Sequence, residues 1–370
     1  MVTIPPQSPG NGHLCHDLIM VVLLVAPFLA QRANGRPVAA LPAPPAYEGA
    51  VGYVAKQTER AVHLHPSREF YPTVVKTPTN GIAVGQLAEW KGAHAPGSWT
   101  SGFWPGALWQ LAALSPARTP AYWGGLAQQY AEGLKPTQFN TGTHDVGFMI
   151  HYSYGLGYGA NASLRAEYGP VIFNTARSLA SRFNSKVGCT ESWSAGKHCN
   201  SHSAHQNVTC PFTVIIDNMM NLEVLLFAAL KVNNAHCNCT TPDRQALVHV
   251  ADTHAHTTAH HHVRADGSVN HIVCYDPATG DELFACNGGG YEDNTTWARG
   301  QAWAIYGFTM VHRCEWRPFR FYSTERQLHK LPPVVHLTRR HARCRHALPR
   351  PPPHCHQTRG LLDPRHARDP

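Results

Sequence analysis

Long apolar runs are missing from this sequence, and charged residues are scarce in it. The clearest apolar run, Leu18–Ala30, has only 13 residues. A helix that crosses a bilayer needs about 20 such residues, so this run is too short for an ordinary membrane span. Charged residues make up 15% of the 370 residues, which is low for a cytosolic protein and acceptable for an extracellular one.

The sequence also lacks recognisable nucleotide, flavin and metal motifs. Cys237 and Cys239 are separated by one residue, which is too tight for a zinc ribbon. A histidine-rich run that contains His254, His256 and His260 falls on an expected helix, but no carboxylate completes a metal site there. We therefore expect no metal and no cofactor. The 11 cysteines fit loop disulfides, whose pairing the sequence leaves open.

The basic charge of the chain is confined to its last part. Residues 311–370 hold 13 Lys and Arg against 4 Asp and Glu, so the rest of the chain holds 31−13 = 18 basic and 23−4 = 19 acidic residues. Residues 314–370 are rich in Arg, His and Pro without a helical period, and we predict a disordered tail. A nucleic-acid-binding tail is the alternative, with steeply salt-dependent binding; we expect no nucleic-acid partner.

Features near the N-terminus predict export. Leu18–Ala30 fits the apolar core of a signal peptide over residues 1–30, although no Lys or Arg precedes it. A membrane anchor or a wrongly chosen start codon is the alternative. Residues 31–46 read as an Ala/Pro-rich linker. Because glycosylation sequons also follow, we expect a secreted glycoprotein without stable membrane association after signal removal; the sequons begin at Asn161, Asn207, Asn238 and Asn294.

The apolar periodicity of residues 47–313 predicts a mainly α-helical domain. Strand signals are sparse, and the best is Ser268–Tyr275. Helical spacing recurs between loops rich in Gly, Pro and Asn, which favours successive helical hairpins. The expected helices span about 47–62, 102–115, 121–134, 144–157, 161–183, 217–232, 242–260 and 297–312.

Four aromatic- and glycine-rich patches indicate a carbohydrate site. They are Trp99–Trp109, His144–Met149, Ile215–Leu222 and Trp297–Phe308. Indole faces stack on the apolar faces of sugar rings, and a pair of acids, here Asp145 and Asp217, is typical of glycoside cleavage. Each Asp also precedes an expected helix, so N-capping is an alternative role that is compatible with catalysis.

Five motifs in this order resemble the unsaturated glucuronyl hydrolases, glycoside hydrolase family 88. They are WTSGFWPG at Trp99–Gly106, HDVGFM at His144–Met149, IIDNMMNL at Ile215–Leu222, RADGSVNHIVCYDPATG at Arg264–Gly280 and WARGQAWAIYGF at Trp297–Phe308. The resemblance implies an all-α (α/α)6 barrel of helical hairpins. It also implies a substrate class, oligosaccharides that polysaccharide lyases leave with a terminal 4,5-unsaturated uronic acid.

The resemblance further implies hydration of the C4=C5 double bond, after which the hemiketal collapses and expels the sugar at C1. Protonation of carbon C4 requires a carboxylic acid, and by resemblance Asp217 is that acid. We expect Asp145 to tune Asp217 or to hold a substrate hydroxyl. Arg299 is suited to the planar uronate carboxylate. The remaining substrate-binding residues that the resemblance implies are Trp99, His271, Trp297 and Trp303.

Two departures from the family pattern bear on activity. The family commonly has Gln-Gly-Tyr before the last motif, where this chain has Gly289, Gly290 and Tyr291. About eight helices are visible where six hairpins need twelve, and the family pattern ends near Arg313. The alternatives are therefore a truncated non-catalytic product or a faulty gene model and, among enzymes, an unsaturated rhamnogalacturonyl hydrolase.

Overall fold

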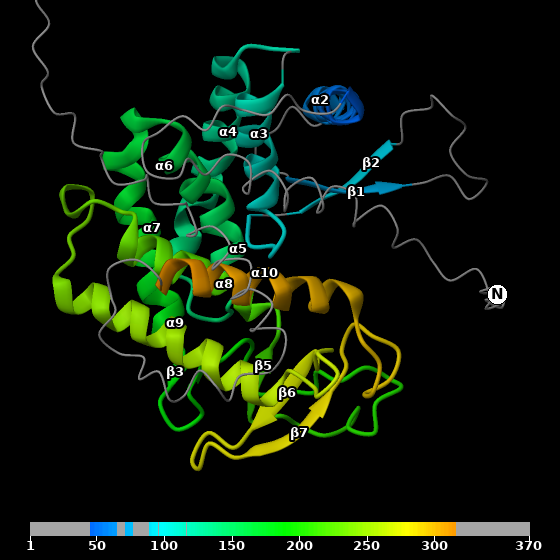
Figure 1. Ribbon diagram of the computed structural model, residues 1–370. Coiled ribbons are helices and arrows are strands. Elements are labelled where there is room, and N and C mark those ends of the chain that lie inside the picture. The colour runs from blue at the N-terminus through cyan, green and yellow to red at the C-terminus, as the bar shows by residue number, and fades with distance from the viewer. Residues whose placement is uncertain (1–44, 65–70, 77–88, 95, 116, 316–370) are drawn as a thin grey trace, which may run out of the picture.

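The computed structural model describes residues 45–64, 71–76, 89–94, 96–115 and 117–315. Within these ranges helices dominate, and the main ones lie where the periodicity predicts them (Figure 1). They are α2 (Pro45–Leu64), α3 (Phe103–Leu114), α4 (Pro120–Leu134), α5 (Val146–Ile150), α6 (Leu156–Ala160), α7 (Arg165–Ala180), α8 (Asn218–Leu230), α9 (Thr241–His261) and α10 (Ala298–Glu315). The predicted signal peptide and the tail from 316 on lie outside the described residues, as does the linker up to residue 44.

Helix α8 is the centre of the helical packing. It lies against α7, α9 and α10, and the start of α5 also contacts it. Its 13 residues, NMMNLEVLLFAAL, are almost all buried, which explains why it is apolar around most of its circumference. Consecutive helices α3 and α4 pack side by side, as do α8 and α9, in the hairpin arrangement expected from the sequence.

The expected helix at 144–157 is interrupted by a π-helical turn. The chain forms α5, then the π segment His151–Gly155 (η2), then α6. The Ser153 hydroxyl donates back to the Met149 carbonyl at 2.6 Å within this segment. Such single π turns recur at functional sites because they rotate the following side chains relative to an α-helix.

Among the described residues seven short strands accompany the helices, although the strand signals in the sequence are sparse and the best is Ser268–Tyr275. The hairpin of β1 (Tyr71–Lys76) and β2 (Glu89–His94) and the hairpin of β3 (Phe183–Asn184) and β4 (Cys189–Thr190) are separate. A three-stranded antiparallel sheet has the order β5 (Phe212–Ile215), β6 (Ile272–Tyr275) and β7 (Glu282–Cys286). Their partners are distant in sequence, so local periodicity gives only a weak signal for them.

Two disulfides fasten this three-stranded sheet. Cys210, before β5, is bonded to Cys274 of β6, and Cys199 is bonded to Cys286 of β7. A third disulfide joins Cys237 to Cys239, and Cys189 is a free buried thiol. The expectation of loop disulfides is thus met among the described cysteines, with a pairing that the sequence did not provide.

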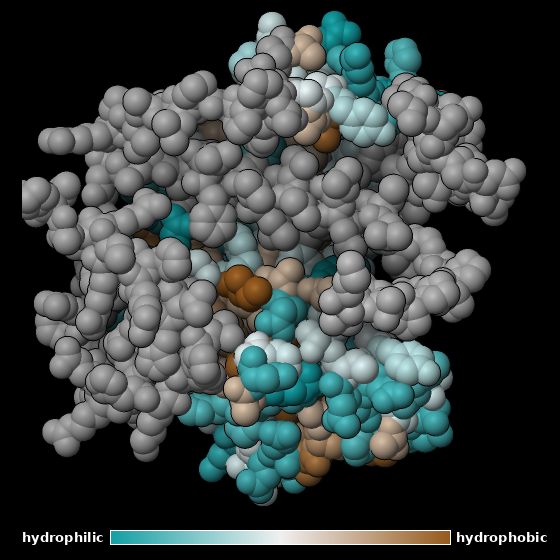
Figure 2. Space-filling model, turned by 45° about the vertical axis from the view of Figure 1, so that its right-hand side comes forward, coloured by the Kyte–Doolittle hydropathy of each residue, from teal (hydrophilic) through white to brown (hydrophobic). Residues whose placement is uncertain are grey.

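The main core lies among the helices, and a smaller one lies against the sheet. Figure 2 shows mainly hydrophilic residues on the lower part of the described surface, with hydrophobic residues in separate spots. No helix among the described residues is long and apolar enough to cross a bilayer.

Candidate active site

Strand pairing brings Asp217 and His271 together. Asp217 follows the end of β5 by two residues, and His271 stands immediately before β6. Because β5 and β6 are antiparallel, with Ile215 opposite Ile272, the end of one strand meets the start of the other. The Ile216 amide donates to the His271 carbonyl at 2.9 Å, which continues the ladder up to the two side chains. Two residues 54 positions apart are therefore neighbours by backbone geometry.

The tautomer of His271 is set by its backbone partners. Its Nδ1 atom accepts the amide hydrogens of Gly288 and Gly289 at 3.0 and 2.9 Å. A nitrogen that accepts two hydrogen bonds carries no proton, so the neutral ring carries its proton on Nε2. That Nε2 atom lies 3.6 Å from Oδ2 of Asp217. His271 thus directs an N–H group at the carboxylate.

Asp217 occupies the N-cap position of α8 without acting as its cap. No side-chain cap hydrogen bond forms there. Its Oδ2 atom is buried and has no hydrogen-bond partner within the described residues, although the side chain as a whole is 14% exposed. Buried carboxylate oxygens are normally paired, because an unpaired one loses hydration without compensation. The fold therefore keeps an acceptor available at this position.

Asp145 is held in a different way at the start of α5. It too stands at the N-cap without a side-chain cap hydrogen bond. Oδ2 accepts from the Thr143 hydroxyl at 2.7 Å and from Trp193 Nε1 at 3.5 Å, and Oδ1 lies 3.1 Å from Nε2 of His144. Burial acts to raise the pKa of Asp145, but the charge and hydrogen bond of His144, with those of Thr143 and Trp193, outweigh it and lower the pKa. Asp145 is therefore an ionised carboxylate.

A buried asparagine links the two carboxylate motifs. The Asn221 side chain accepts the Phe148 amide hydrogen at 2.7 Å and donates to the Asp217 carbonyl at 3.2 Å. A Cβ atom on Gly147 would lie 2.5 Å from Oδ1 of Asn221, so only glycine permits this close approach of α5 to α8. The HDVGFM and IIDNMMNL motifs thus form a single unit.

Arg299 lies between two indoles at the start of α10. Its guanidinium carbon lies 4.3 Å from the Trp297 ring centre and 5.4 Å from that of Trp99. Trp297 in turn packs against His271, with ring centres 4.2 Å apart. The half-buried indoles hold the planar cation by cation–π contact. Five predicted site residues therefore form one connected group: Asp217, His271, Trp297, Arg299 and Trp99.

Trp303 lies in the protein interior, behind the two half-buried indoles. It is fully buried in a cluster with Phe148, Tyr152 and Met220, against which Trp99 and Trp297 pack. Its indole supports the aromatic layer from behind, so in this structure it acts in packing. The substrate contact that the resemblance implies for Trp303 stays a prediction.

The surroundings of Gly289 leave no room for the glutamine that the family commonly has before the last motif. A Cβ atom at this position would lie 2.7 Å from Cε2 of Trp297, so the indole occupies the space that a larger residue needs. The Gly289 amide, meanwhile, helps to fix His271. In this chain the site is completed here by backbone and indole contacts, where the family commonly has a glutamine side chain.

Beneath the carboxylates lie buried histidines. Burial lowers the pKa of His254 to about 3 and that of His262 to about 4, so both are neutral near pH 7. His254 Nδ1 accepts the Thr190 amide hydrogen at 3.0 Å, which makes it a structural residue. Within the described ranges, no cluster of three or more His, Cys, Asp or Glu is arranged to hold a metal ion.

Sequence reasoning missed Trp193, Asn221 and Glu223. Trp193 comes from a polar loop and lies beside Asp145 because of a β-bridge to Thr143, with a second bridge to Thr213; these long-range contacts have no local signal. Glu223 is buried under the aromatic layer, where Tyr306 donates to it at 2.8 Å and His151 lies 3.4 Å away. Its place six residues after Asp217 in an apolar helix was a signal that the sequence did contain.

Comparisons with known proteins agree with the motifs. No protein-family model matches the chain. The unsaturated glucuronyl hydrolase of Formosa agariphila is 37% identical over 217 residues, which are 58% of this chain and 48% of that protein. The unsaturated chondroitin disaccharide hydrolase of Streptococcus agalactiae is 27% identical over 231 residues, again 58% of this chain and 48% of that protein. The chain thus spans about half the length of the curated relatives it matches.

A solved structure extends the likeness to the fold. A crystal structure of an unsaturated glucuronyl hydrolase specific for heparin matches with a TM-score of 0.59 and 28% identity, covering 82% of this chain and 68% of that one. The helical hairpins of this chain are thus those of the (α/α)6 barrel of these enzymes. In both sequence and fold, the chain is thus similar to the unsaturated glucuronyl hydrolases of glycoside hydrolase family 88.

Proposed function

We propose that this chain hydrolyses oligosaccharides that end in a 4,5-unsaturated glucuronyl residue, by hydration of the C4=C5 double bond. The observation that carries the proposal is the buried Oδ2 atom of Asp217, which lies beside the Nε2 atom of His271 and has no hydrogen-bond partner among the described residues. A vinyl ether reacts when a proton is added to carbon C4, because the positive charge at C5 is shared with the ring oxygen. The acid that delivers this proton needs an oxygen that the protein leaves uncommitted.

Asp217 is the proposed acid and His271 its positioning residue. Once Asp217 has given its proton to C4, it is a carboxylate, and the N–H group on Nε2 of His271 lies beside the new charge. The carboxylate then takes a proton from the water that adds to C5. The resulting hemiketal opens to a C5 ketone, and the sugar at C1 leaves as the hemiacetal collapses.

The stack of Trp99, Arg299 and Trp297 is the proposed substrate clamp. The indoles offer flat apolar faces to the unsaturated ring, and the guanidinium between them suits the planar carboxylate at C5. Asp145 is ionised and fully hydrogen-bonded, so we assign it an electrostatic and substrate-holding role, while proton transfer belongs to Asp217.

The experiment follows the ultraviolet absorbance of the conjugated double bond in an unsaturated glucuronyl disaccharide. Wild type should consume the absorbance, and Asp217→Asn should lower the rate by about 10²–10⁴-fold, the usual contribution of a general acid. Asp281→Asn is the matched control, because Asp281 lies on an exposed turn between β6 and β7 and should leave the rate unchanged. In D2O, the product should gain one deuterium at C4.

Two results would overturn the proposal. One is wild-type product without deuterium at C4, which would indicate direct displacement at C1. The other is a folded wild-type chain that leaves the double bond intact, which would favour the non-catalytic alternative.

We also propose that the chain is exported. The three disulfides support this, since such bonds persist in oxidising compartments. Asn207, Asn238 and Asn294 are exposed in their sequons, as glycosylation in the secretory pathway requires. Digestion of the secreted protein with an N-glycosidase should reduce its mass; an unchanged mass together with retention in the cytosol would contradict this.

A further inference from the structure

The short disulfide between Cys237 and Cys239 lies at the end of α8 opposite to Asp217. It connects residues only two positions apart, in the loop between α8 and α9. Both cysteines are partly exposed, and Asn238 between them is exposed. The other two disulfides link residues 87 and 64 positions apart, and of their four cysteines only Cys199 is partly exposed.

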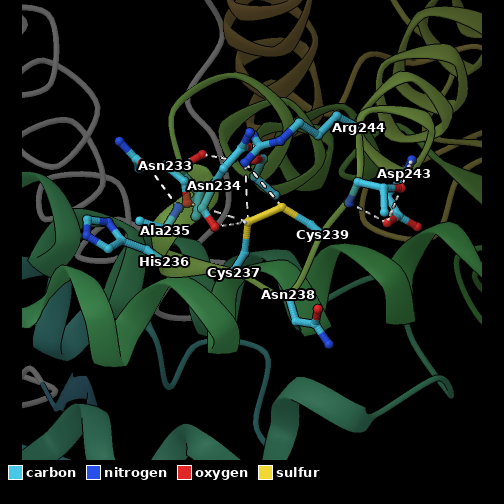
Figure 3. The surroundings of a disulfide bond; sticks show 12 residues. Asn233, Asn234, Ala235, His236, Cys237, Asn238, Cys239, Asp243 and Arg244 are labelled. Atoms are coloured by element: carbon cyan, nitrogen blue, oxygen red, sulfur yellow. Dashed lines mark hydrogen bonds between the residues drawn. A yellow bond between two sulfur atoms is a disulfide. The ribbon is translucent and has the colours of Figure 1, made fainter.

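A guanidinium lies directly against this disulfide. Arg244 Nη2 donates to Sγ of Cys237 and to Sγ of Cys239, each at 3.2 Å (Figure 3). The same side chain is held by three backbone carbonyls at the end of α8, so its position does not depend on the sulfur atoms. A fixed cation beside sulfur stabilises the thiolate form of cysteine, which is both the reactive and the leaving form in thiol–disulfide exchange.

The other charged groups around the loop balance one another. Arg177 donates to the Asn238 carbonyl at 3.0 Å and pairs with Asp243 at 3.4 Å. Asp243 also accepts from Thr240 at the start of α9. His236 is bound to the Tyr158 hydroxyl at 2.9 Å. Among the described residues around the sulfurs, Arg244 therefore supplies the charge that acts on them directly.

We propose that Cys237 and Cys239 form a redox-active pair that exchanges with an external dithiol. A thiolate of the dithiol attacks one sulfur, the Cys237–Cys239 bond breaks, and a mixed disulfide and a protein thiolate form. The second thiol of the reagent then attacks its own sulfur in the mixed disulfide and releases the second protein sulfur. Two electrons pass to the protein, and the dithiol leaves as its disulfide. Arg244 holds the reduced sulfurs as thiolate.

The test is a dithiothreitol titration of the full chain, with free thiols trapped by iodoacetamide and located by peptide mass spectrometry. Cys237 and Cys239 should be half reduced at a dithiothreitol concentration at least about tenfold below that for Cys199–Cys286 and Cys210–Cys274. Cys189 is an internal control for unfolding, since burial raises the pKa of its thiol to about 12 and should keep it unlabelled. Reduction of all three disulfides at one concentration would refute the proposal.

Variants separate the effect of Arg244 from that of structure. In Arg244→Gln, the labelling rate of the reduced pair at pH 6.5 should fall about tenfold, the change that a pKa rise of one unit produces. Arg244→Lys keeps the charge and should retain most of the rate. Arg177→Gln removes a nearby guanidinium that does not touch the sulfurs and should change the rate less than twofold. An unchanged rate in folded Arg244→Gln would also refute the proposal. If Arg244→Gln does not fold, the proposal is tested by the order in which dithiothreitol reduces the three disulfides of the wild-type chain.

Discussion

The polar groups at the two ends of helix α8 differ in their hydrogen bonding. At the C-terminal end, Arg244 donates to the carbonyls of Ala228, Ala229 and Val232 at 2.7–3.0 Å, and these carbonyls would otherwise lack helical partners. At the N-terminal end, Oδ2 of Asp217 is buried, and no described residue forms a hydrogen bond with it. One end therefore serves stability, while the other retains an unpaired acceptor for a ligand to complete.

The two ends of α8 also differ in the disulfides that surround them. Cys210–Cys274 and Cys199–Cys286 fasten the sheet whose strands position Asp217 and His271. The loop at the other end carries only the local Cys237–Cys239 bond. The disulfide-linked sheet must be rigid to keep this carboxylate unpaired. If the backbone relaxed, the Asp217 side chain could move and form a hydrogen bond with another group.

Replacing Cys210 and Cys274 by serine should produce a large loss of stability. Their bond closes a loop of 64 residues, and such a crosslink contributes about 4 kcal/mol by restricting the unfolded chain. Urea unfolding followed by circular dichroism measures the change. The matched control is the double replacement of Cys237 and Cys239 by serine, which should change the free energy of unfolding by less than about 1 kcal/mol because the closed loop is so short. An equal loss of unfolding free energy in the two double variants would show that the disulfides at the two ends of α8 stabilise the fold equally.

Arg244→Gln should cause the next largest loss of stability and should leave turnover of the unsaturated disaccharide unchanged. The substitution leaves the last carbonyls of α8 without their charged donor, which costs about 3 kcal/mol. Arg177→Gln, whose guanidinium is largely exposed, should cost less than about 1 kcal/mol. Turnover of the unsaturated disaccharide per folded molecule should stay at the wild-type value. A fall in turnover would mean that both ends of α8 serve the reaction.

Asn221→Ala should lower both stability and turnover. It leaves the buried Phe148 amide unpaired, at a cost of about 2 kcal/mol, and unfastens α5 from the start of α8. Asn174→Ala is the matched control, because Asn174 binds Gln138 away from the carboxylates. The control should lower the free energy of unfolding without affecting turnover, and parallel losses of turnover in both variants would argue against the link.

The last expected effect is a pH slope in stability, which is small near neutral pH and grows as the pH falls. His254 and His262 have pKa values lowered to about 3 and about 4 in the folded chain, whereas the unfolded value is about 6.5. The unfolded chain therefore binds more protons below about pH 6.5. Stability should fall as the pH drops from about 6.5 to about 4, by about 1 kcal/mol per pH unit for each histidine. Urea unfolding of His254→Gln should show a shallower slope, and an unchanged slope would contradict this assignment.

Local sequence predicted the helices well, and it failed where distant segments meet. The apolar period of NMMNLEVLLFAAL defines α8 almost to the residue, because a buried helix needs apolar side chains on most of its faces. By contrast, the contact between Asp217 and His271 depends on the register of β5 and β6, which no local pattern encodes. The family motifs supplied the pairing that periodicity could not.

The residues missed in the site share a cause. Trp193 reaches Asp145 only through bridges among three separate segments, and the roles of Gly289 and Trp303 depend on what packs around them. Capping was a fair expectation for Asp145 and Asp217 from position alone. The structure puts both at N-caps, yet neither side chain forms the cap hydrogen bond; Asp145 binds Thr143 and His144, and Asp217 lies beside His271.

Asp217→Asn separates a catalytic role of Asp217 from a structural one when stability and turnover are measured on one protein sample. Since Oδ2 of Asp217 accepts no hydrogen bond from the described residues, its replacement by an amide nitrogen should change the free energy of unfolding by less than about 1 kcal/mol. Turnover of the unsaturated glucuronyl disaccharide should fall by about 10²–10⁴-fold. Full turnover in Asp217→Asn, or a loss of stability as large as that of Arg244→Gln, would contradict the account, because Asp217 would then be a structural residue like Arg244.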